Sequence, residues 1–351
     1  MTEPEPVLAP DLDAIVERNA DDFELLRGAR LFVTGGTGFV GSWLLESFAW
    51  ANRRLALDAS AVVLTRHPGA FGGAAPHLLA DPAISLRRGD LGDAGALWGT
   101  FDAIIHAATA TAAGPSGLTP QTIIETTVDG TRRVLDLARR NGSIPFLFTS
   151  SGAVYGRAPA SLERFEERCL AAPDPLQPRF AYHEAKRLAE LLCAADVERA
   201  GLQAKIARLF AFVGPYLPLE RNFAIGNFIA DVLAGRTIEV SGDGTAVRSY
   251  LYAADLATWL WRILARGKPA RAYNVGSERP YSIAEVAGIV AAAGQASSEV
   301  TVRAVPAPAS QLERYVPDTQ RARTELGLGE TVSLEAGIRR TIDWHRARRT
   351  G

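Results

Sequence analysis

Tyr182 and Lys186 stand four residues apart in the stretch YHEAK, which opens a segment with a helical pattern. Residues at positions i and i+4 lie on one face of a helix, so the phenol and the amine can converge. A tyrosine near its reference pKa of about 10 is a poor base at neutral pH, and a nearby ammonium ion lowers that pKa by stabilising the phenolate. Such a pair can exchange a proton with a hydroxyl group while hydride passes to a nicotinamide. The alternative is an ordinary pair on the surface of a helix.

A serine supplies a third group with suitable chemistry. Ser151, in FTSSGAVYG, ends the fifth strand that we predict, and parallel strands of an open α/β fold present their carboxyl ends to ligands. Its hydroxyl could hydrogen-bond the reacting hydroxyl or carbonyl oxygen. We expect the neighbouring hydroxyls of Thr149 and Ser150 to satisfy local backbone groups instead.

The stretch LFVTGGTGFVGSWLL, Leu31 to Leu45, has the glycines of a phosphate-binding loop. It follows a predicted strand and opens a predicted helix, the setting that the dinucleotide fingerprint requires. Its glycines permit the tight turn, the approach of the backbone to the pyrophosphate and close packing of helix on strand. The pyrophosphate would lie on the free N–H groups of the helix; the alternative is a tight turn that binds nothing. The cofactor-binding residues that we predict in this loop are Gly35, Thr37, Gly38, Phe39, Val40 and Gly41.

The type of dinucleotide depends on the residues that end the second predicted strand. An NAD site usually has an acidic residue there, which bonds the ribose 2′-hydroxyl, but this chain has Thr65 and Arg66. Because an arginine can pair with a 2′-phosphate, Arg66 favours NADP slightly over NAD. The alternative is a solvated arginine that stacks over the adenine. Asp90, followed by Leu91, ends the third strand and could accept a hydrogen bond from the adenine amino group, unless it caps a helix.

Short β-rich runs alternate with helical segments up to Gly214. The runs are RLFVTGG, AVVLTR, AISLRRGD, DAIIHAA, PFLFTS and AKIARLFAFVG, and the helical segments include Gly41–Ala51, Thr122–Arg140 and Ala181–Arg199. Several runs are apolar on both faces, as in a parallel sheet buried between helices. This alternation predicts an α/β fold with a doubly wound parallel sheet, the Rossmann fold.

The pattern loosens after Gly214, where turns rich in Pro and Gly mix with helices. Between them, RSYLYAADLATWLWRILARG has the pattern of one more strand–helix unit. We predict an N-terminal helical extension over 1–28 and a dinucleotide-binding domain over 29–213 plus 246–272. A smaller mixed α/β substrate domain would comprise 214–245 plus 273–351.

The composition is that of an ordinary globular protein. Of 351 residues, 47% are hydrophobic and 22% charged, and the net charge of -1 gives no sign of a nucleic acid or membrane partner. Cys169 and Cys193 form no CxxC pair, so we expect reduced thiols. The acidic first residues lack the apolar core of a secretory signal, and no apolar run is long enough for a membrane helix. We therefore expect a cytoplasmic location.

Eight stretches of the chain, taken in order, resemble the extended short-chain dehydrogenase/reductase family of nucleotide-sugar epimerases, dehydratases and reductases. They are TGGTGFVG, GDL, HAA, SSGAVYG, YHEAK, GDGTAVRSYLYAADLA, YNVGS and RYVPDTQRARTELGL, and the resemblance runs from about Arg30 to about Leu328. It implies a catalytic triad of Ser151, Tyr182 and Lys186. It also implies a nucleotide-diphosphate sugar as substrate and a homodimer.

The same resemblance implies further site residues. Ala107, Ala108 and Thr109 would line the dinucleotide. Arg248 and Arg314 match the arginines that bind the substrate diphosphate, and planar guanidinium groups do grip phosphate bidentately. For each arginine, the alternative is a surface ion pair.

The residues after Ser151 bear on the type of reaction. In the family, 4,6-dehydratases carry an Asp-Glu pair there and decarboxylases typically keep a Glu, whereas this chain has Gly152 and Ala153, which cannot transfer a proton. That favours, as the first candidate, an epimerase acting at C4 through a transient keto sugar. The second candidate is an NADPH-dependent ketoreductase. A 4,6-dehydratase or decarboxylase and a non-catalytic NAD(P)-binding sensor rank lower.

Other positions depart from the family pattern. Thr127, Ala211 and Phe212 stand where asparagines are common, so we expect substrate contacts from Asn222 or Asn227, unless these are turn and helix-surface residues. We expect His183 to be a solvated helix residue and His106 a packed core residue. No metal site is expected, because His67, His77 and His345 lack the spacing of metal ligands.

Overall fold

The computed structural model describes residues 7–93, 95, 97–109, 118–157, 159, 161–219, 223–294, 299–303 and 313–350. They form two compact units. The first comprises Met1–Val154, Pro173–Arg208 and Ala257–Tyr273, and the second comprises Tyr155–Ala172, Leu209–Leu256 and Asn274–Gly351. The assignment of a cofactor role to one part of the chain and a substrate role to another stays a prediction.

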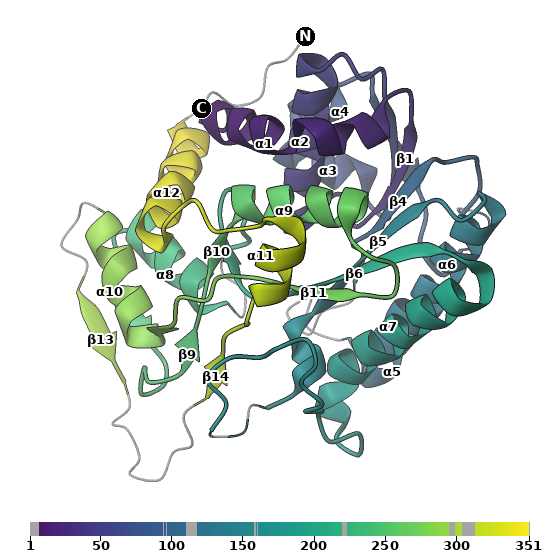
Figure 1. Ribbon diagram of the computed structural model, residues 1–351. Coiled ribbons are helices and arrows are strands. Elements are labelled where there is room, and N and C mark those ends of the chain that lie inside the picture. Colours follow the sequence, from purple (N-terminus) through teal and green to yellow (C-terminus); the bar gives the residue numbers. More distant parts are fainter. Residues whose placement is uncertain are drawn as a thin grey trace. The chain divides into compact units, whose positions relative to one another are not determined.

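A seven-stranded sheet is the centre of the first unit (Figure 1). Its order is β11-β6-β5-β4-β1-β2-β3, and the pairs from β3 to β5 are parallel. The strands are β1 Arg30–Thr34, β2 Ser60–Thr65, β3 Ile84–Arg88, β4 Ala103–His106, β5 Pro145–Ser151, β6 Gln203–Leu209 and β11 Ala272–Val275. The predicted doubly wound α/β fold is therefore confirmed, with β1 to β6 matching the six predicted runs.

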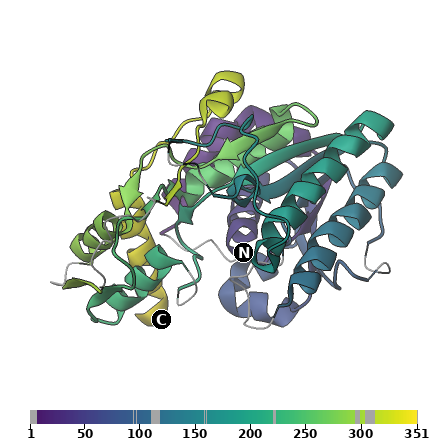
Figure 2. The ribbon, with the colours of Figure 1, turned by 90° about the horizontal axis from the view of Figure 1, so that it is seen from below.

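Helices cover both faces of this sheet, as Figures 1 and 2 show. The helices α5, α6 and α7 lie on one face, and α2 and α9 lie on the other. Their bounds are α2 Phe39–Arg54, α5 Pro120–Ile124, α6 Gly130–Arg140, α7 Ala181–Ala200 and α9 Ala253–Arg266; two short helices, α3 Pro68–Ala74 and α4 Pro76–Leu79, follow β2. Buried aromatic residues of the strands, such as Phe32, Phe146 and Phe148, pack with the inner sides of α6 and α7.

The predicted helical segment over Thr122–Arg140 is present, with one irregularity. A π-helical segment, Glu125–Asp129, separates α5 from α6. Such a segment adds a residue to the turn and shifts the side chains that follow it. A Cβ atom on Gly130 would lie 2.9 Å from Cδ1 of Leu91, so α6 begins in close contact with the loop after β3.

The N-terminal segment forms helix α1, Ala9–Phe23, and a short 3-10 turn, Glu24–Leu26. The apolar side of α1 is buried, including Leu12, Ile15 and Phe23. Its neighbours are α2 and the part of α9 that belongs to the same unit, where the ring of Phe23 lies 5.2 Å from that of Trp261. The regularly spaced apolar residues of α1 thus form one face that packs against α2 and α9.

In the part of the chain that the structure describes, the second unit contains small sheets and helices. Its helices are α8 Ala224–Leu233, α10 Ile283–Ala293, α11 Gln320–Leu326 and α12 Leu334–Thr350; its strand pairs are β7 Phe212–Val213 with β10 Leu251–Tyr252, β8 Ile238–Val240 with β13 Val300–Val302, and β9 Val247–Arg248 with both β12 Tyr281–Ser282 and β14 Arg314–Tyr315. The predicted extra strand–helix unit is present as β10 and α9. Its strand pairs with β7, however, and does not join the large sheet.

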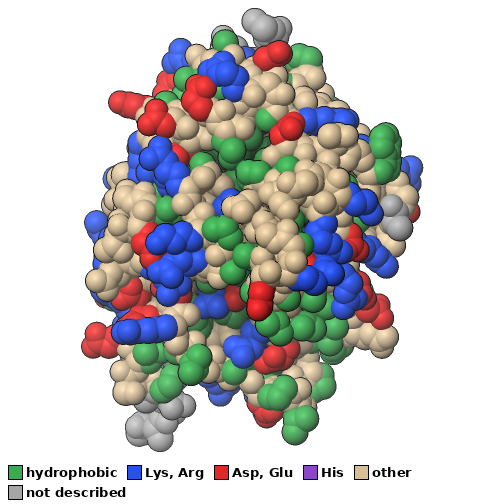
Figure 3. All heavy atoms as spheres, turned by 45° about the vertical axis from the view of Figure 1, so that its right-hand side comes forward, with side chains coloured by type: hydrophobic (Ala, Val, Ile, Leu, Met, Phe, Trp, Pro, Cys, Tyr) green, Lys and Arg blue, Asp and Glu red, His purple; other side chains and the backbone are tan. Residues whose placement is uncertain are grey.

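Lys/Arg and Asp/Glu side chains are interspersed over the face that Figure 3 shows, in keeping with a net charge of -1. Among the described residues, no helix combines the length and apolar composition needed to cross a membrane. The cytoplasmic location stays a prediction. Within the same residues, His, Cys, Asp and Glu side chains form no group that could hold a metal ion.

Candidate active site

The glycines of the loop after β1 are fixed by close contacts. Gly35 has φ +72°, and a Cβ atom there would lie 2.5 Å from the carbonyl carbon of Ala107. A Cβ atom on Gly41 would lie 2.3 Å from the carbonyl oxygen of Gly35. The first glycine therefore lets the chain turn against the end of β4, and the last lets α2 pack on the turn.

Gly38 ends the turn and caps α2. Its N–H donates to the carbonyl oxygen of Gly35 over 3.2 Å, and its own carbonyl accepts from the Ser42 N–H over 2.8 Å. No side chain of the described residues caps this helix, so the N–H groups of Phe39 and Val40 keep their capacity to bind an anion. The loop therefore fits the pyrophosphate of a dinucleotide: its turn is so tight that Cβ atoms at Gly35 and Gly41 would clash, and it ends at the free N–H groups of α2. The hydroxyl of Thr37 lies 3.5 Å from that of Thr65, at the end of β2.

Arg66 and Asp90, the two charged residues predicted for the adenosine end of the cofactor, lie beside each other. The Nε of Arg66 is 3.8 Å from Oδ2 of Asp90, and both side chains are exposed. The other carboxylate oxygen of Asp90 accepts the Gly92 N–H over 2.9 Å, so this aspartate caps a turn. Leu91 is buried against Gly130, where it packs the loop. An exposed aspartate beside Arg66 offsets part of the charge that a 2′-phosphate would meet.

A buried histidine holds the end of β4. The hydroxyl of Thr131 donates to the carbonyl oxygen of Thr127 over 2.6 Å and accepts from Nε2 of His106 over 3.1 Å. His106 Nδ1 is then the acceptor for the Thr34 hydroxyl, 2.7 Å away. The Thr34 oxygen in turn accepts the Ala108 N–H over 3.2 Å. Burial, with the nearby Lys186 charge, lowers the pKa of His106 to about 3, which keeps the ring neutral. The prediction of a packed core histidine is confirmed.

Ser151, Tyr182 and Thr109 come together at the carboxyl ends of β4 and β5. The phenol of Tyr182, on the first turn of α7, is hydrogen-bonded to the hydroxyls of Ser151 and Thr109. Burial raises the pKa of Tyr182, and these two hydrogen bonds partly oppose the rise. This direction differs from the lowering expected from the lysine, because the cost of burying a phenolate exceeds its local stabilisation.

Lys186 lies one turn further along α7, and its side chain is buried. Its Nζ donates to the carbonyl oxygen of Thr149 over 2.7 Å and lies 4.6 Å from the centre of the Phe148 ring. Burial lowers the pKa of Lys186 to about 7, and the charge of Glu190 opposes this fall. The predicted triad residues thus lie on one helix and one strand end, with the lysine anchored to β5.

The sequence did not predict that Ser150 and Glu190 contact each other beside this site. The Ser150 hydroxyl donates to Oε1 of Glu190 over 2.5 Å, so the expectation that it serves local backbone groups is wrong. The Thr149 hydroxyl does bond the backbone, donating to the carbonyl oxygen of His106 over 3.3 Å. The spacing of Glu190, four residues after Lys186, was the available signal, because it places the carboxylate on the same face of the helix.

Gly152 and Ala153 begin a 3-10 turn, Gly152–Tyr155, directly after Ser151. The Ala153 N–H donates to the Ser151 hydroxyl oxygen over 3.1 Å, which fixes the serine side chain. His183, expected to be solvated, is instead partly buried, and its ring lies 5.1 Å from that of Phe180; its Nδ1 has no hydrogen-bond partner among the described residues. Burial lowers the pKa of His183, so it is a neutral ring beside Tyr182.

The residues predicted to bind the substrate diphosphate lie in the second unit. Arg248 donates to the carboxylate of Glu313 over 2.8 Å and to the carbonyl oxygens of Val247 and Glu313. Arg314 lies on β14, which pairs with β9 in parallel register. Asn227 is exposed on α8, and Asn222 lies outside the described residues. A diphosphate role for the two arginines stays a prediction.

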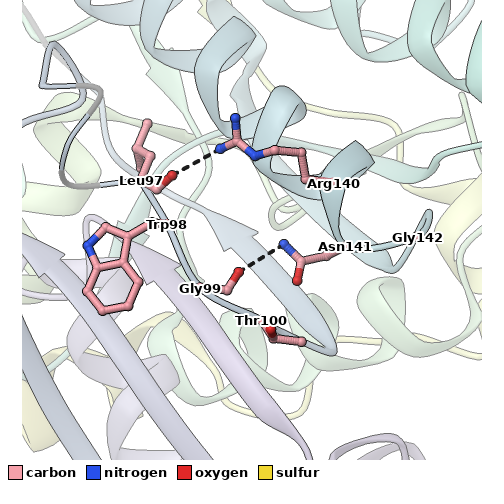
Figure 4. Close-up of a pocket in the computed structure, with 7 residues that line it drawn as sticks. All are labelled: Leu97, Trp98, Gly99, Thr100, Arg140, Asn141 and Gly142. Atoms are coloured by element: carbon pink, nitrogen blue, oxygen red, sulfur yellow. Dashed lines mark hydrogen bonds between the residues drawn. The ribbon is translucent and has the colours of Figure 1, made fainter.

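A surface hollow of about 800 Å³ lies at the amino end of β4 in the first unit (Figure 4). It is lined by Leu97, Trp98, Gly99, Thr100, Arg140, Asn141 and Gly142. Asn141 closes it by accepting the Phe101 N–H over 2.8 Å and donating to the carbonyl oxygen of Gly99 over 3.2 Å. These bonds join the end of α6 to the loop before β4. The polar groups of Asn141 in the hollow therefore hold these two segments together.

Residues 31–276 match the model of the NAD dependent epimerase/dehydratase family. The chain is 29% identical to dTDP-glucose 4,6-dehydratase of Streptomyces antibioticus over 91% of its own length and 93% of that protein. It is 30% identical to UDP-glucuronic acid decarboxylase 1 of Arabidopsis thaliana, with 91% and 70% covered. Among solved structures, DesIV of Streptomyces venezuelae, a dTDP-glucose 4,6-dehydratase with NAD and TYD bound, aligns with a TM-score of 0.78 at 29% identity, covering 92% of this chain and 98% of that one.

Proposed function

Because the chain belongs to the NAD dependent epimerase/dehydratase family of extended short-chain dehydrogenases/reductases, we propose that it epimerises a nucleotide-diphosphate sugar at C4. The observation that carries this proposal is the pairing of the Ser151–Tyr182–Lys186 group with Gly152 and Ala153. The first group can exchange a proton at a carbinol. The two small residues offer no acid or base for elimination, although the named relatives include dehydratases and decarboxylases.

The proposed mechanism follows from the positions of these side chains. The cofactor would rest on the loop from Gly35 to Gly41 and would supply the hydride acceptor. Ser151 would hydrogen-bond the C4 oxygen, and Tyr182 as phenolate would take its proton while the C4 hydride leaves. After the keto sugar turns over, hydride returns to the other face of C4 and the phenol returns the proton. No atom is lost, so substrate and product are stereoisomers.

Lys186 would help Tyr182 to lose its proton and become a phenolate. Tyr182 is protonated in the unliganded chain, because burial raises its pKa. An ammonium ion one helical turn away, together with the positive charge of an oxidised nicotinamide, would stabilise the phenolate once the cofactor is bound. Tyr182→Phe is therefore expected to abolish turnover while the protein still retains the dinucleotide. Turnover by that variant would refute the assignment.

A second candidate, an NADPH-dependent reductase of nucleotide 4-keto sugars, is favoured by Arg66 at the end of β2. The same tyrosine would then donate a proton to a ketone while hydride arrives. Bound NAD released from the purified protein would support the epimerase. An empty protein that consumes NADPH with a keto sugar, followed by the loss of reduced-nicotinamide absorbance, would support the reductase.

We also infer a homodimer through α5 and α7, which pack beside each other in the first unit. Three large apolar side chains of these helices are exposed: Ile124 (43%), Leu188 (43%) and Leu191 (63%). Figure 3 brings this side of the molecule forward and shows hydrophobic side chains among the charged ones. Apolar residues at such spacing are typical of a helix–helix interface. Sedimentation of the full chain and of Leu191→Glu tests this inference.

A further inference from the structure

A buried carboxylate lies one helical turn beyond Lys186. Glu190 is only 9% exposed and accepts hydrogen bonds from Arg208 on β6, including Nε to Oε1 over 3.0 Å and Nη2 to Oε2 over 2.6 Å. It also accepts the Ser150 hydroxyl. A bidentate pair with a third hydrogen bond fixes the carboxylate in one orientation. Three elements, α7, β5 and β6, therefore converge on this oxygen pair.

The other titratable groups around Lys186 carry no negative charge at neutral pH. Tyr182, on the preceding turn of α7, is protonated because burial raises its pKa. Cys193, further along α7, stays a thiol for the same reason. His106, on β4, is neutral, and Arg208, on β6, is a cation. Within the described residues, Glu190 is thus the anion that acts on the lysine from these elements.

We propose that Glu190, held by Arg208 and Ser150, is a positioning residue that keeps Lys186 an ammonium ion and α7 aligned on β5. This inference rests on the proposed roles of Lys186 and Tyr182. A neutral lysine would no longer stabilise the phenolate, so the carboxylate sets the proton affinity of the tyrosine through the lysine. Glu190 itself touches neither cofactor nor substrate in this scheme.

The balance of charges gives the sign of the effect. Burial lowers the pKa of Lys186 to about 7 even though the charge of Glu190 opposes the fall. Glu190→Gln removes the opposing charge and leaves the Arg208 cation without its partner. Both changes lower the proton affinity of Lys186 further, because an opposite charge favours the ammonium ion and a like charge disfavours it.

The sequence makes this effect directly measurable. Lys186, Lys205 and Lys268 are the three lysines of the chain. Protein labelled with 13C-lysine therefore gives three side-chain signals, which Lys-to-Arg variants assign. In Glu190→Gln the Lys186 signal is expected to titrate about one pH unit or more below wild type. Lys205, whose pKa burial lowers to about 8, reports an intact β6 if its titration stays unchanged.

Matched variants separate charge from structure. Glu190→Asp keeps the charge and should restore most of the Lys186 titration. Ser150→Ala removes a tether and leaves the charge, so its Lys186 signal should titrate as in wild type. If Glu190→Gln fails to fold because Arg208 is left unpaired, the double variant Glu190→Gln with Arg208→Gln takes its place. An unshifted Lys186 signal in the folded variant overturns the proposal.

The titration needs no turnover, so it is independent of the proposed function. In the holoenzyme, loss of the ammonium ion ends activity, so the alkaline limb of the Glu190→Gln rate profile should move to lower pH. A lysine shift in a protein that turns over no nucleotide sugar would refute the proposed function alone. A fully active wild type with an unshifted lysine would refute only the role of Glu190.

Discussion

The hydroxyl of Thr34 donates to Nδ1 of His106 over 2.7 Å, joining the ends of β1 and β4 beneath the glycine loop. The same Thr34 oxygen accepts the Ala108 N–H, so the histidine supports the backbone against which Gly35 packs. His106 is therefore part of the framework of the cofactor site, although it faces the core. Its neutrality is needed because Nδ1 can accept the Thr34 hydroxyl only when that ring nitrogen carries no proton.

His106 should make the fold sensitive to acid. Its folded pKa of about 3 lies below its ordinary value of 6.5, so the unfolded chain binds the proton first. Stability is then lost as pH falls below about 6.5, by up to about 1.4 kcal/mol per pH unit from this group. In His106→Asn, the free energy of unfolding measured in urea should change less with pH. The difference in slope should correspond to close to one proton taken up on unfolding. Equal slopes for the two proteins would contradict the network.

Gly35 should be essential for cofactor binding. Gly35→Ala places a Cβ atom at φ +72° and 2.5 Å from the Ala107 carbonyl carbon, so the loop or the end of β4 must move. We expect dinucleotide affinity to fall about tenfold or more, measured by calorimetry. Gly288→Ala is the matched control, because its new Cβ atom would meet nothing within 4 Å and it lies in helix α10. Unchanged affinity in Gly35→Ala would show that the turn tolerates a side chain.

Asp22 should anchor the N-terminal helix. Its fully buried carboxylate pairs with Arg262 and Arg266 of α9 and accepts from Asn19 over 3.0 Å. Asp22→Asn leaves these cations poorly paired and should destabilise the protein by about 3 kcal/mol in urea unfolding. Its neighbour Asp21, 92% exposed, provides the control, since Asp21→Asn should change stability by less than about 0.5 kcal/mol. Similar effects of the two changes would argue against the anchor.

Arg66 should set the preference for cofactor phosphate. If its guanidinium meets a 2′-phosphate, Arg66→Ala should weaken NADPH about tenfold and leave NADH unchanged, since a charge-assisted hydrogen bond contributes about 1.5–3 kcal/mol. Arg132→Ala, on the exposed side of α6, controls for the loss of one positive charge. Equal losses for both cofactors would indicate that Arg66 contacts the adenine and leaves the preference to other groups.

Local patterns predicted the parts of the site that depend on neighbouring residues in the chain. The glycines after β1 and the i, i+4 pair of Tyr182 and Lys186 are such cases, and so are the six strands β1 to β6. Each follows from turn geometry or from a periodicity that a single segment displays. The family resemblance added Thr109, which contacts Tyr182.

Features that depend on contacts between distant segments escaped prediction. Such features include the close contact of Gly130 with Leu91 and the role of Ser150, which depends on Glu190. The raised pKa of Tyr182 reflects burial, which the spacing of a motif does not report. The short strand β11, Ala272–Val275, becomes recognisable only through its place beside β6.

The masses of the products test the central claim most directly. The purified chain would be incubated with a panel of UDP- and dTDP-sugars and the products separated by chromatography with mass detection. The account predicts a product of unchanged mass and altered retention, which Tyr182→Phe does not form. A product that has lost water or carbon dioxide would contradict it, because Gly152 and Ala153 would then be no obstacle to elimination or decarboxylation.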